Sequence, residues 1–290
     1  MLIANPVLKR MLVPFSTLSI ALLGVSSCNA FDPLDNPGSD PQYLSAARAC
    51  FDKGDFACAR ENYSKLSSSY LDTVTAEESF ITLDEEGASM GAIMEFVGNL
   101  SDKGTGQALT IFANRLAPGA GVNRRVAIWK AYSAAANGSI KNADLKNFVV
   151  FVSSLSLAAE ILAEGSEGTS QVPYTYLVSP SCKAASAAAC AITAGCDAPS
   201  GATLVRNTSS IDATTQPTNA QASTRQLYDA IYISLDAMTK LGAGGRFSSA
   251  LNDFSSITQG LGSNSTTIGT TAAVDRCFRQ TLVSLGVGTF

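Results

Sequence analysis

Residues 40–66 read DPQYLSAARACFDKGDFACARENYSKL, and this stretch predicts a hairpin of two helices. Asp40 and Pro41 open the first helix, because aspartate is a favoured N-cap residue and proline suits the first helical position. Gly54 can adopt the left-handed conformation that ends a helix, and Asp55 can cap the next one. Small and aromatic side chains recur at helical spacing on both sides of this turn. We therefore expect two short antiparallel helices.

Cys50 and Cys58 lie four residues before and after Gly54. An antiparallel hairpin would bring the two sulfur atoms face to face. A disulfide that closes so short a loop contributes about 2–3 kcal/mol to stability. We predict that these two cysteines pair, with a redox role as the alternative.

The same hairpin resembles a tetratricopeptide repeat over residues 41–71. The matching positions are Ala47, Gly54-Asp55-Phe56, Ala59 and Tyr63. The repeat's usual closing proline is missing, since Leu71 stands there. The resemblance implies stacked helix pairs that bind a protein or peptide on a concave face. The alternative is an ordinary short helical hairpin.

Upstream of the hairpin, residues 22–28 read LLGVSSC, an apolar run that ends in small residues and a cysteine. Lys9 and Arg10 precede it as a positive region, as in a signal peptide. The segment Val25-Ser26-Ser27-Cys28 resembles the lipobox of bacterial lipoproteins, which implies cleavage before Cys28 and a diacylglyceryl group on its sulfur. In that family the following residue, here Asn29, favours the outer membrane.

This resemblance implies that residues 1–27 are a signal peptide and that residues 28–40 are a flexible tether. The alternatives are an ordinary secretory leader cleaved after Ala30 and a retained membrane anchor. A lipid anchor would hold the protein firmly in the membrane, because each buried methylene contributes about 0.8 kcal/mol. Which face of the membrane the protein would occupy stays open.

The remainder of the chain shows helical periodicity and predicts an all-α fold of stacked antiparallel helix pairs, tetratricopeptide-like or α-solenoid-like, stapled by disulfides. We expect an N-terminal array over residues 41–165 and a C-terminal region over residues 166–290, which could form one continuous domain with the array. The C-terminal region contains a Ser/Thr-rich loop over residues 197–222. The expected helices after the hairpin are 75–97, 105–116, 123–136, 142–165, 182–196, 227–241, 247–257 and 271–285.

The chain has seven cysteines, so six remain if Cys28 is acylated. An even number in an exported chain indicates disulfides. Besides the hairpin pair, the remaining four are Cys182, Cys190, Cys196 and Cys277. They allow three connectivities, and the spacing does not choose among them. A metal cluster is a weak alternative, because no Cys-x-x-Cys pair is present.

The composition argues against several classes of function. The chain has no histidine, which excludes Ser-His-Asp and Cys-His catalysis and histidine-ligated zinc. No lysine follows a serine by three residues, so a Ser-x-x-Lys nucleophile is also absent. Loss of residues 1–27 removes two basic residues and no acid, which lowers the formal net charge from −4 to −6. That sign disfavours nucleic acid as a partner.

A few charged residues remain to be interpreted. Glu160 and Glu164, one helical turn apart, could serve a carboxylate-dependent cell-wall or glycan hydrolase, although exposed helix glutamates explain them more simply. Arg124 and Arg125 form an isolated basic pair, and the acidic run 84–86 is expected to be solvated.

We therefore expect a non-catalytic, lipid-anchored envelope protein that needs no cofactor and acts as a helical scaffold for an unidentified envelope protein or peptide. The alternative is an accessory ligand-binding lipoprotein of a transport system, and the hydrolase is a third hypothesis.

Overall fold

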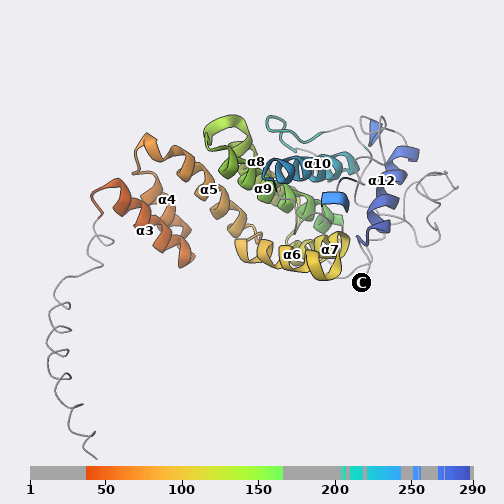
Figure 1. Ribbon diagram of the computed structural model, residues 1–290, viewed down its shortest axis with the longest axis horizontal. Coiled ribbons are helices and arrows are strands. Elements are labelled where there is room, and N and C mark those ends of the chain that lie inside the picture. Colours follow the sequence, from red (N-terminus) through yellow and green to blue (C-terminus); the bar gives the residue numbers. More distant parts are fainter. Residues whose placement is uncertain are drawn as a thin grey trace, which may run out of the picture. The chain divides into compact units, whose positions relative to one another are not determined.

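The computed structural model describes residues 37–165, 204, 206, 210–217, 221–242, 251–253, 255, 267–270 and 272–287. Across these residues the regular secondary structure is helical and includes no β-strand, which confirms the all-α prediction (Figure 1). The expected lipobox, the helix 182–196 and most of the helix 247–257 lie outside the described residues. The chain divides into two compact units, residues 1–67 and 68–290, and each is described by itself.

The first unit contains the predicted hairpin, made of α3 (Asp40–Asp52) and α4 (Phe56–Tyr63). Gly54 has φ of 74°, so it takes the left-handed conformation expected at this turn. Asp55 caps α4, because its Oδ1 accepts a hydrogen bond from the Cys58 backbone N–H at 3.1 Å. Helix α4 ends at Tyr63, three residues earlier than Leu66, where the apolar pattern stops.

The N-terminus of α3 differs in one detail from the sequence-based expectation. Ser39 is the N-cap residue, and Asp40 is the first residue of the helix. The carboxylate of Asp40 instead accepts hydrogen bonds from the backbone N–H of Ser67 at 3.1 Å and from its hydroxyl at 2.5 Å. These bonds attach the end of the hairpin to its beginning.

The second unit begins with the short 3-10 helix η2 (Ser68–Tyr70). The prediction of a single helix over residues 75–97 is wrong. Two helices occupy that region, α5 (Leu71–Glu85) and α6 (Met90–Lys103). The break comes at Gly87, which has φ of 82°. Ser89 then caps α6 by accepting a hydrogen bond from the Ala92 N–H at 3.3 Å. Thr75, where the predicted helix begins, lies inside α5.

The next helices follow the sequence prediction closely. They are α7 (Thr105–Leu116), α8 (Val122–Ala134) and α9 (Ala143–Gly165), with a short π-helical turn η3 (Ala135–Ser139) after α8. Asn142, the first residue of the predicted range, caps α9, since its side-chain oxygen accepts a hydrogen bond from the Leu145 N–H at 3.0 Å. Two further helices are α10 (Thr224–Lys240) and α12 (Ala272–Ser284).

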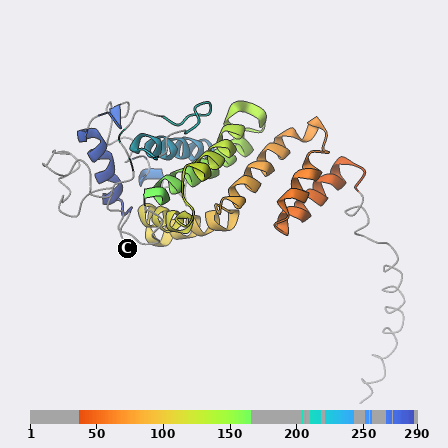
Figure 2. The same cartoon turned by 180° about the vertical axis from the view of Figure 1, so that it is seen from behind.

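Helix α9 lies at the centre of this unit, in contact with α5, α7, α8 and α10. In Figures 1 and 2 it runs between α10 on one side and α6 and α7 on the other. From Phe151 to Ala163 every residue of α9 is buried. Among the described helices, α9 is long and apolar enough to meet the criteria for a membrane span, yet 89% of its most apolar window is buried inside the protein. Burial on several sides explains its unusual hydrophobicity.

Part of the predicted Ser/Thr-rich loop is described, and side chains of two helices hold it in place. Trp129 of α8 donates its indole N–H to the Asp212 carbonyl at 2.9 Å, and Ser133 donates to the Ala213 carbonyl at 2.6 Å. Asp229 of α10 accepts a hydrogen bond from the Ile211 N–H at 2.9 Å. Residues 211–217 therefore have an irregular backbone that is fixed to the helical core.

Candidate functional site

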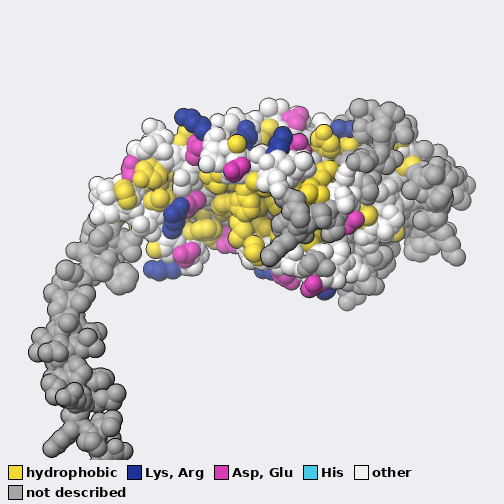
Figure 3. All heavy atoms as spheres, viewed as in Figure 1, with side chains coloured by type: hydrophobic (Ala, Val, Ile, Leu, Met, Phe, Trp, Pro, Cys, Tyr) yellow, Lys and Arg dark blue, Asp and Glu magenta, His cyan; other side chains and the backbone are white. Residues whose placement is uncertain are grey.

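An apolar groove opens on the surface of the second unit between α6, α9 and α10, and we call it the methionine groove. It has a volume of about 260 Å³, and all of its lining side chains are apolar. The lining residues are Met90, Ile93, Met94 and Val97 of α6, Phe148 and Phe151 of α9, Met238 of α10, and Leu241 just after α10. Figure 3 shows hydrophobic side chains gathered over α6 and α9 on the face seen in Figure 1.

Several side chains of the methionine groove reach solvent. Met94 is 61% exposed, and Met90 and Phe148 are each more than one third exposed. Exposed large apolar side chains that gather at one place mark interaction surfaces more often than isolated ones do. Methionine is flexible and polarisable, so surfaces rich in it can adapt to different apolar partners. The groove can therefore accept an apolar group without a fixed polar orientation.

The sequence alone does not reveal this groove. The α6 stripe recurs at positions i, i+3, i+4 and i+7, which is also the pattern of a buried helix face. Which part of such a stripe other helices cover depends on the tertiary packing. The only available signal was the pair of methionines, Met90 and Met94, and it does not distinguish core from surface.

A second feature is a cluster of charged side chains inside the same unit, which we call the arginine–glutamate cluster. Its members are Glu86 after α5, Arg124 and Arg125 of α8, and Glu160 and Glu164 of α9. Arg125 and Glu160 are fully buried. The expectation that the two glutamates are exposed is therefore wrong, and the two arginines of the isolated basic pair have acidic partners.

The contacts within the cluster connect several helices. Arg125 pairs directly with Glu164 at 2.5 Å. Arg124 donates to the backbone carbonyls of Leu116 at 2.5 Å and Pro118 at 3.0 Å, which fixes the turn between α7 and α8. Its guanidinium also lies 3.6 Å from Glu86, so that acidic residue is not simply solvated as expected.

Glu160 has a different environment from Glu164. Its Oε1 accepts a hydrogen bond from the Gly121 N–H at the start of α8, at 2.8 Å. Its Oε2 accepts no hydrogen bond within the described part of the chain, and the Arg124 guanidinium is 3.6 Å away. Burial raises the pKa of Glu160 to about 7, although the Gly121 N–H and Arg124 oppose this shift. Burial also raises the pKa of Glu164 to about 7, against the direct contact with Arg125.

This geometry gives little support to the hydrolase hypothesis. A glycosidase needs two carboxyl groups that flank a bound sugar. Glu160 and Glu164 instead face arginines and backbone amides, and neither lines the methionine groove. Within the described residues, no group of three or more histidine, cysteine, aspartate or glutamate side chains could hold a metal ion.

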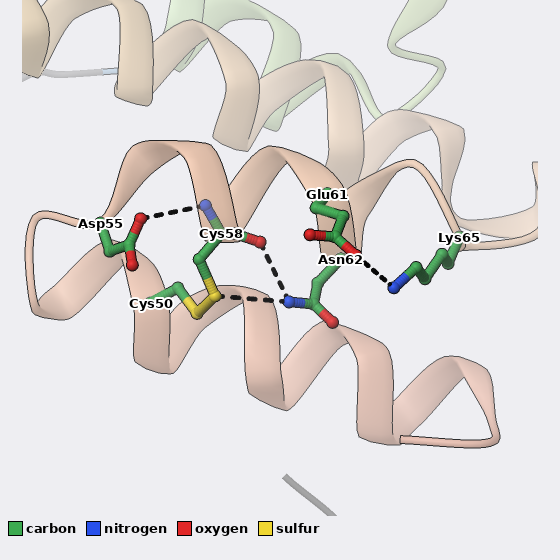
Figure 4. Close-up of a disulfide and its surroundings, with 6 residues drawn as sticks. All are labelled: Cys50, Asp55, Cys58, Glu61, Asn62 and Lys65. Carbon is green, nitrogen blue, oxygen red and sulfur yellow. Dashed lines mark hydrogen bonds and ion pairs between the residues drawn. A yellow bond between two sulfur atoms is a disulfide. The ribbon is translucent and has the colours of Figure 1, made fainter. Parts of the chain in front are cut away.

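The cysteine prediction is confirmed for the hairpin. Cys50 and Cys58 form a disulfide with a Cα–Cα distance of 5.7 Å (Figure 4). Asn62 donates its side-chain amide to the Cys58 carbonyl at 3.0 Å and also approaches the Cys58 sulfur at 3.6 Å. On the next turn Glu61 and Lys65 form an ion pair at 2.8 Å. The disulfide therefore staples the two helices next to their connecting turn.

The other predicted cysteine sites are only partly covered. Cys277 of α12 is disulfide-bonded, as expected for a member of the C-terminal set. Cys28, Cys182, Cys190 and Cys196 lie outside the described residues. Lipidation at Cys28 and the C-terminal connectivity stay predictions.

Comparisons of the chain with protein-family models, with curated proteins and with solved structures find no match.

Proposed function

We propose that this protein is a non-catalytic binding protein of the bacterial envelope, held at the outer membrane by a lipid on Cys28, and that its helical body binds a protein or peptide through the methionine groove. The observation that carries the proposal is the exposed, wholly apolar lining of that groove on α6, α9 and α10. The lipobox-like segment before Cys28 supports the membrane location.

The shape of the groove favours one apolar face of a partner helix. Its α6 wall presents four side chains over two helical turns, from Met90 to Val97. A helix that binds in a groove inserts side chains at positions i, i+3 or i+4, and i+7. An extended peptide is less suitable, because its backbone N–H and C=O groups would lose water without finding polar partners.

Two variants test this proposal: one carries a new negative charge in the groove, and the other carries the same charge outside it. Met94→Glu should weaken capture of the envelope partner at least tenfold, because a carboxylate would have to be buried against apolar side chains. Leu71→Glu is the matched control, since Leu71 is also an exposed apolar residue, 49% accessible, and does not line the groove. If both variants capture the same partner as well as the parent does, the groove is not the binding site.

A second candidate is a ligand-binding accessory protein of a transport system, in which the groove holds the hydrocarbon part of a small amphiphile. The described side chains that line the groove are all apolar, which favours this candidate over one that recognises a sugar or an amino acid. A fluorescent fatty acid that binds the parent and not Met94→Glu would support it. If the probe does not bind the parent, this second candidate is rejected and the protein-partner proposal is unaffected.

The membrane location is tested separately. Mass spectrometry of the mature protein should find an acylated Cys28 at the N-terminus. The Cys28→Ala variant should leave the outer-membrane fraction. A mature chain that begins after Ala30 would show ordinary secretion instead.

A further inference from the structure

The arginine–glutamate cluster contains more acidic than basic groups. The carboxylates of Glu86, Glu160 and Glu164 face the two guanidinium groups of Arg124 and Arg125. With every group ionised, the cluster would carry one uncompensated negative charge. Because Glu160 and Arg125 are fully buried, water does not screen that charge as it would at the surface.

The uncompensated charge falls on Glu160. Glu164 has a direct ion pair with Arg125. The guanidinium of Arg124 instead donates hydrogen bonds to two backbone carbonyls and lies 3.6 Å from both Glu86 and Glu160. Oε2 of Glu160 is buried without a hydrogen bond in the described part of the chain. A proton on this oxygen would remove the charge and leave Oε1 bound to the Gly121 N–H.

We propose that Glu160 is a proton-sensitive latch: its neutral carboxyl group holds the α7–α8 turn against α9, and its ionisation releases that turn. The charged groups that face Glu160 are Arg124 and Arg125 of α8 and Glu164 of its own helix, with Glu86 beyond Arg124. Ionisation would strengthen the bond from the Gly121 N–H, but it would also leave a buried carboxylate whose Oε2 accepts no hydrogen bond in the described part of the chain, and opening of the turn would admit water to that oxygen. The turn is the segment that opens because the Gly121 N–H and the carbonyls of Leu116 and Pro118 are all held by this cluster.

Burial raises the pKa of Glu160 to about 7. Its change of charge therefore falls near neutral pH, which agrees with this role. The protein would therefore have a more tightly held α7–α8 turn in a mildly acidic medium than in an alkaline one. This inference does not depend on the methionine groove or on lipidation.

Amide hydrogen exchange of the full chain tests the latch directly. If opening of the turn exposes Glu160 to water, the protection factor of the Gly121 amide should fall by up to about tenfold for each pH unit between about pH 4.5 and 7 and level off above pH 7, after correction for intrinsic exchange. Glu160→Gln, which keeps a neutral side chain of the same shape, should show no such slope. Glu95→Gln is the control, because Glu95 forms an exposed ion pair with Arg115. A flat profile in the parent, or an equal slope in Glu160→Gln, overturns the proposal.

A second measurement needs no variant to fold. Carbon-13 NMR of the glutamate side-chain carboxyl groups in the parent protein follows each titration separately. A midpoint between pH 6 and 8 for the carboxyl group assigned to Glu160 by its contact with the Gly121 amide supports the latch. If every glutamate titrates near its ordinary value of about 4.3, Glu160 is ionised at neutral pH and the proposal is wrong.

Discussion

Replacement of Arg125 by methionine tests the energetics of the arginine–glutamate cluster most directly. Arg125 is fully buried, and its guanidinium contacts Glu164, whose side chain is only 9% exposed. Methionine has a similar length and packs well in apolar surroundings, but it leaves Glu164 without its direct cation. Removal of one partner of a buried ion pair costs about 3–5 kcal/mol. Because Arg125 lowers the pKa of Glu164, the carboxyl group of the variant is either buried without its cation or takes up a proton, and we expect Arg125→Met to lose up to that much stability at pH 8.

The double variant Arg125→Met/Glu164→Gln separates the charge from the packing. The amide of glutamine is neutral, and its oxygen can still accept the hydrogen bond that the Ala222 N–H donates to Glu164. We expect the double variant to recover most of the lost stability, because replacing both members of a buried pair is often close to neutral.

The pH dependence of the single variant provides an internal check. A buried carboxyl group with a raised pKa binds more protons in the folded than in the unfolded state, so its effect on stability becomes more favourable as the pH falls. The cost of Arg125→Met should therefore be smaller at pH 5 than at pH 8.

Denaturant unfolding measures these differences. Trp129 is the only tryptophan of the chain and is buried on α8, so its fluorescence reports on the second unit alone. The slope of free energy against denaturant should stay constant across the variants, which shows that the unfolding transition is the same. The reasoning is refuted if Arg125→Met lies within about 1 kcal/mol of the parent at pH 8, or if the double variant is no more stable than the single one.

Three further predictions concern other parts of the chain. Cys58→Ser should destabilise the hairpin by about 2–3 kcal/mol in thermal unfolding, and a reductant should then have no further effect on the hairpin. Gly106→Ala should cost about 1–3 kcal/mol in the same denaturant assay, because its Cβ would lie 2.1 Å from the Leu285 carbonyl oxygen and the backbone would have to move. Gly98→Ala is the matched control. Its Cβ would meet no atom within 4 Å, so this variant should not be destabilised. Glu160→Gln should show a shallower dependence of unfolding free energy on pH than the parent between about pH 4.5 and 7. In that range Glu160 of the parent is ionised in the unfolded state only, so the parent loses stability as the pH rises.

The sequence predicted most helices of the described residues, because their signals are local. Apolar periodicity predicts α7, α8 and α9, and Pro118-Gly119, Gly138 and Asn142 are boundary signals that act within one or two turns. The disulfide of the hairpin was predictable for the same reason, since a tight turn leaves its two cysteines few other partners.

The break between α5 and α6 could not be predicted in this way. The apolar spacing of three and four residues continues across Gly87, so the periodicity is the same for one helix and for two. Glycine is tolerated inside helices at a cost of about 1 kcal/mol. What decides the break is that Gly87 takes a positive φ and that Ser89 caps the next helix.

The arginine–glutamate cluster depends on tertiary structure. Arg125 and Glu164 are 39 residues apart in the sequence, and each looks like an ordinary charged residue on a helix surface. Only the packing of α8 against α9 places the two side chains together. A charged residue on the apolar side of a helix was the one available signal, and it gave no indication of which residue would pair with it.

The two glutamates also decide how α9 should be interpreted. By length and apolar composition this helix meets the criteria for a membrane span. Its last two turns, however, carry Glu160 and Glu164, and arginines from α8 lie against both of them. If α9 left the bundle for lipid, both carboxyl groups would lose these guanidinium partners in a medium without water to replace them. The hydrophobic remainder of α9 is already covered by α5, α7, α8 and α10. Its apolar composition therefore reflects its position as the central helix of the second unit, and the buried charges fix it there.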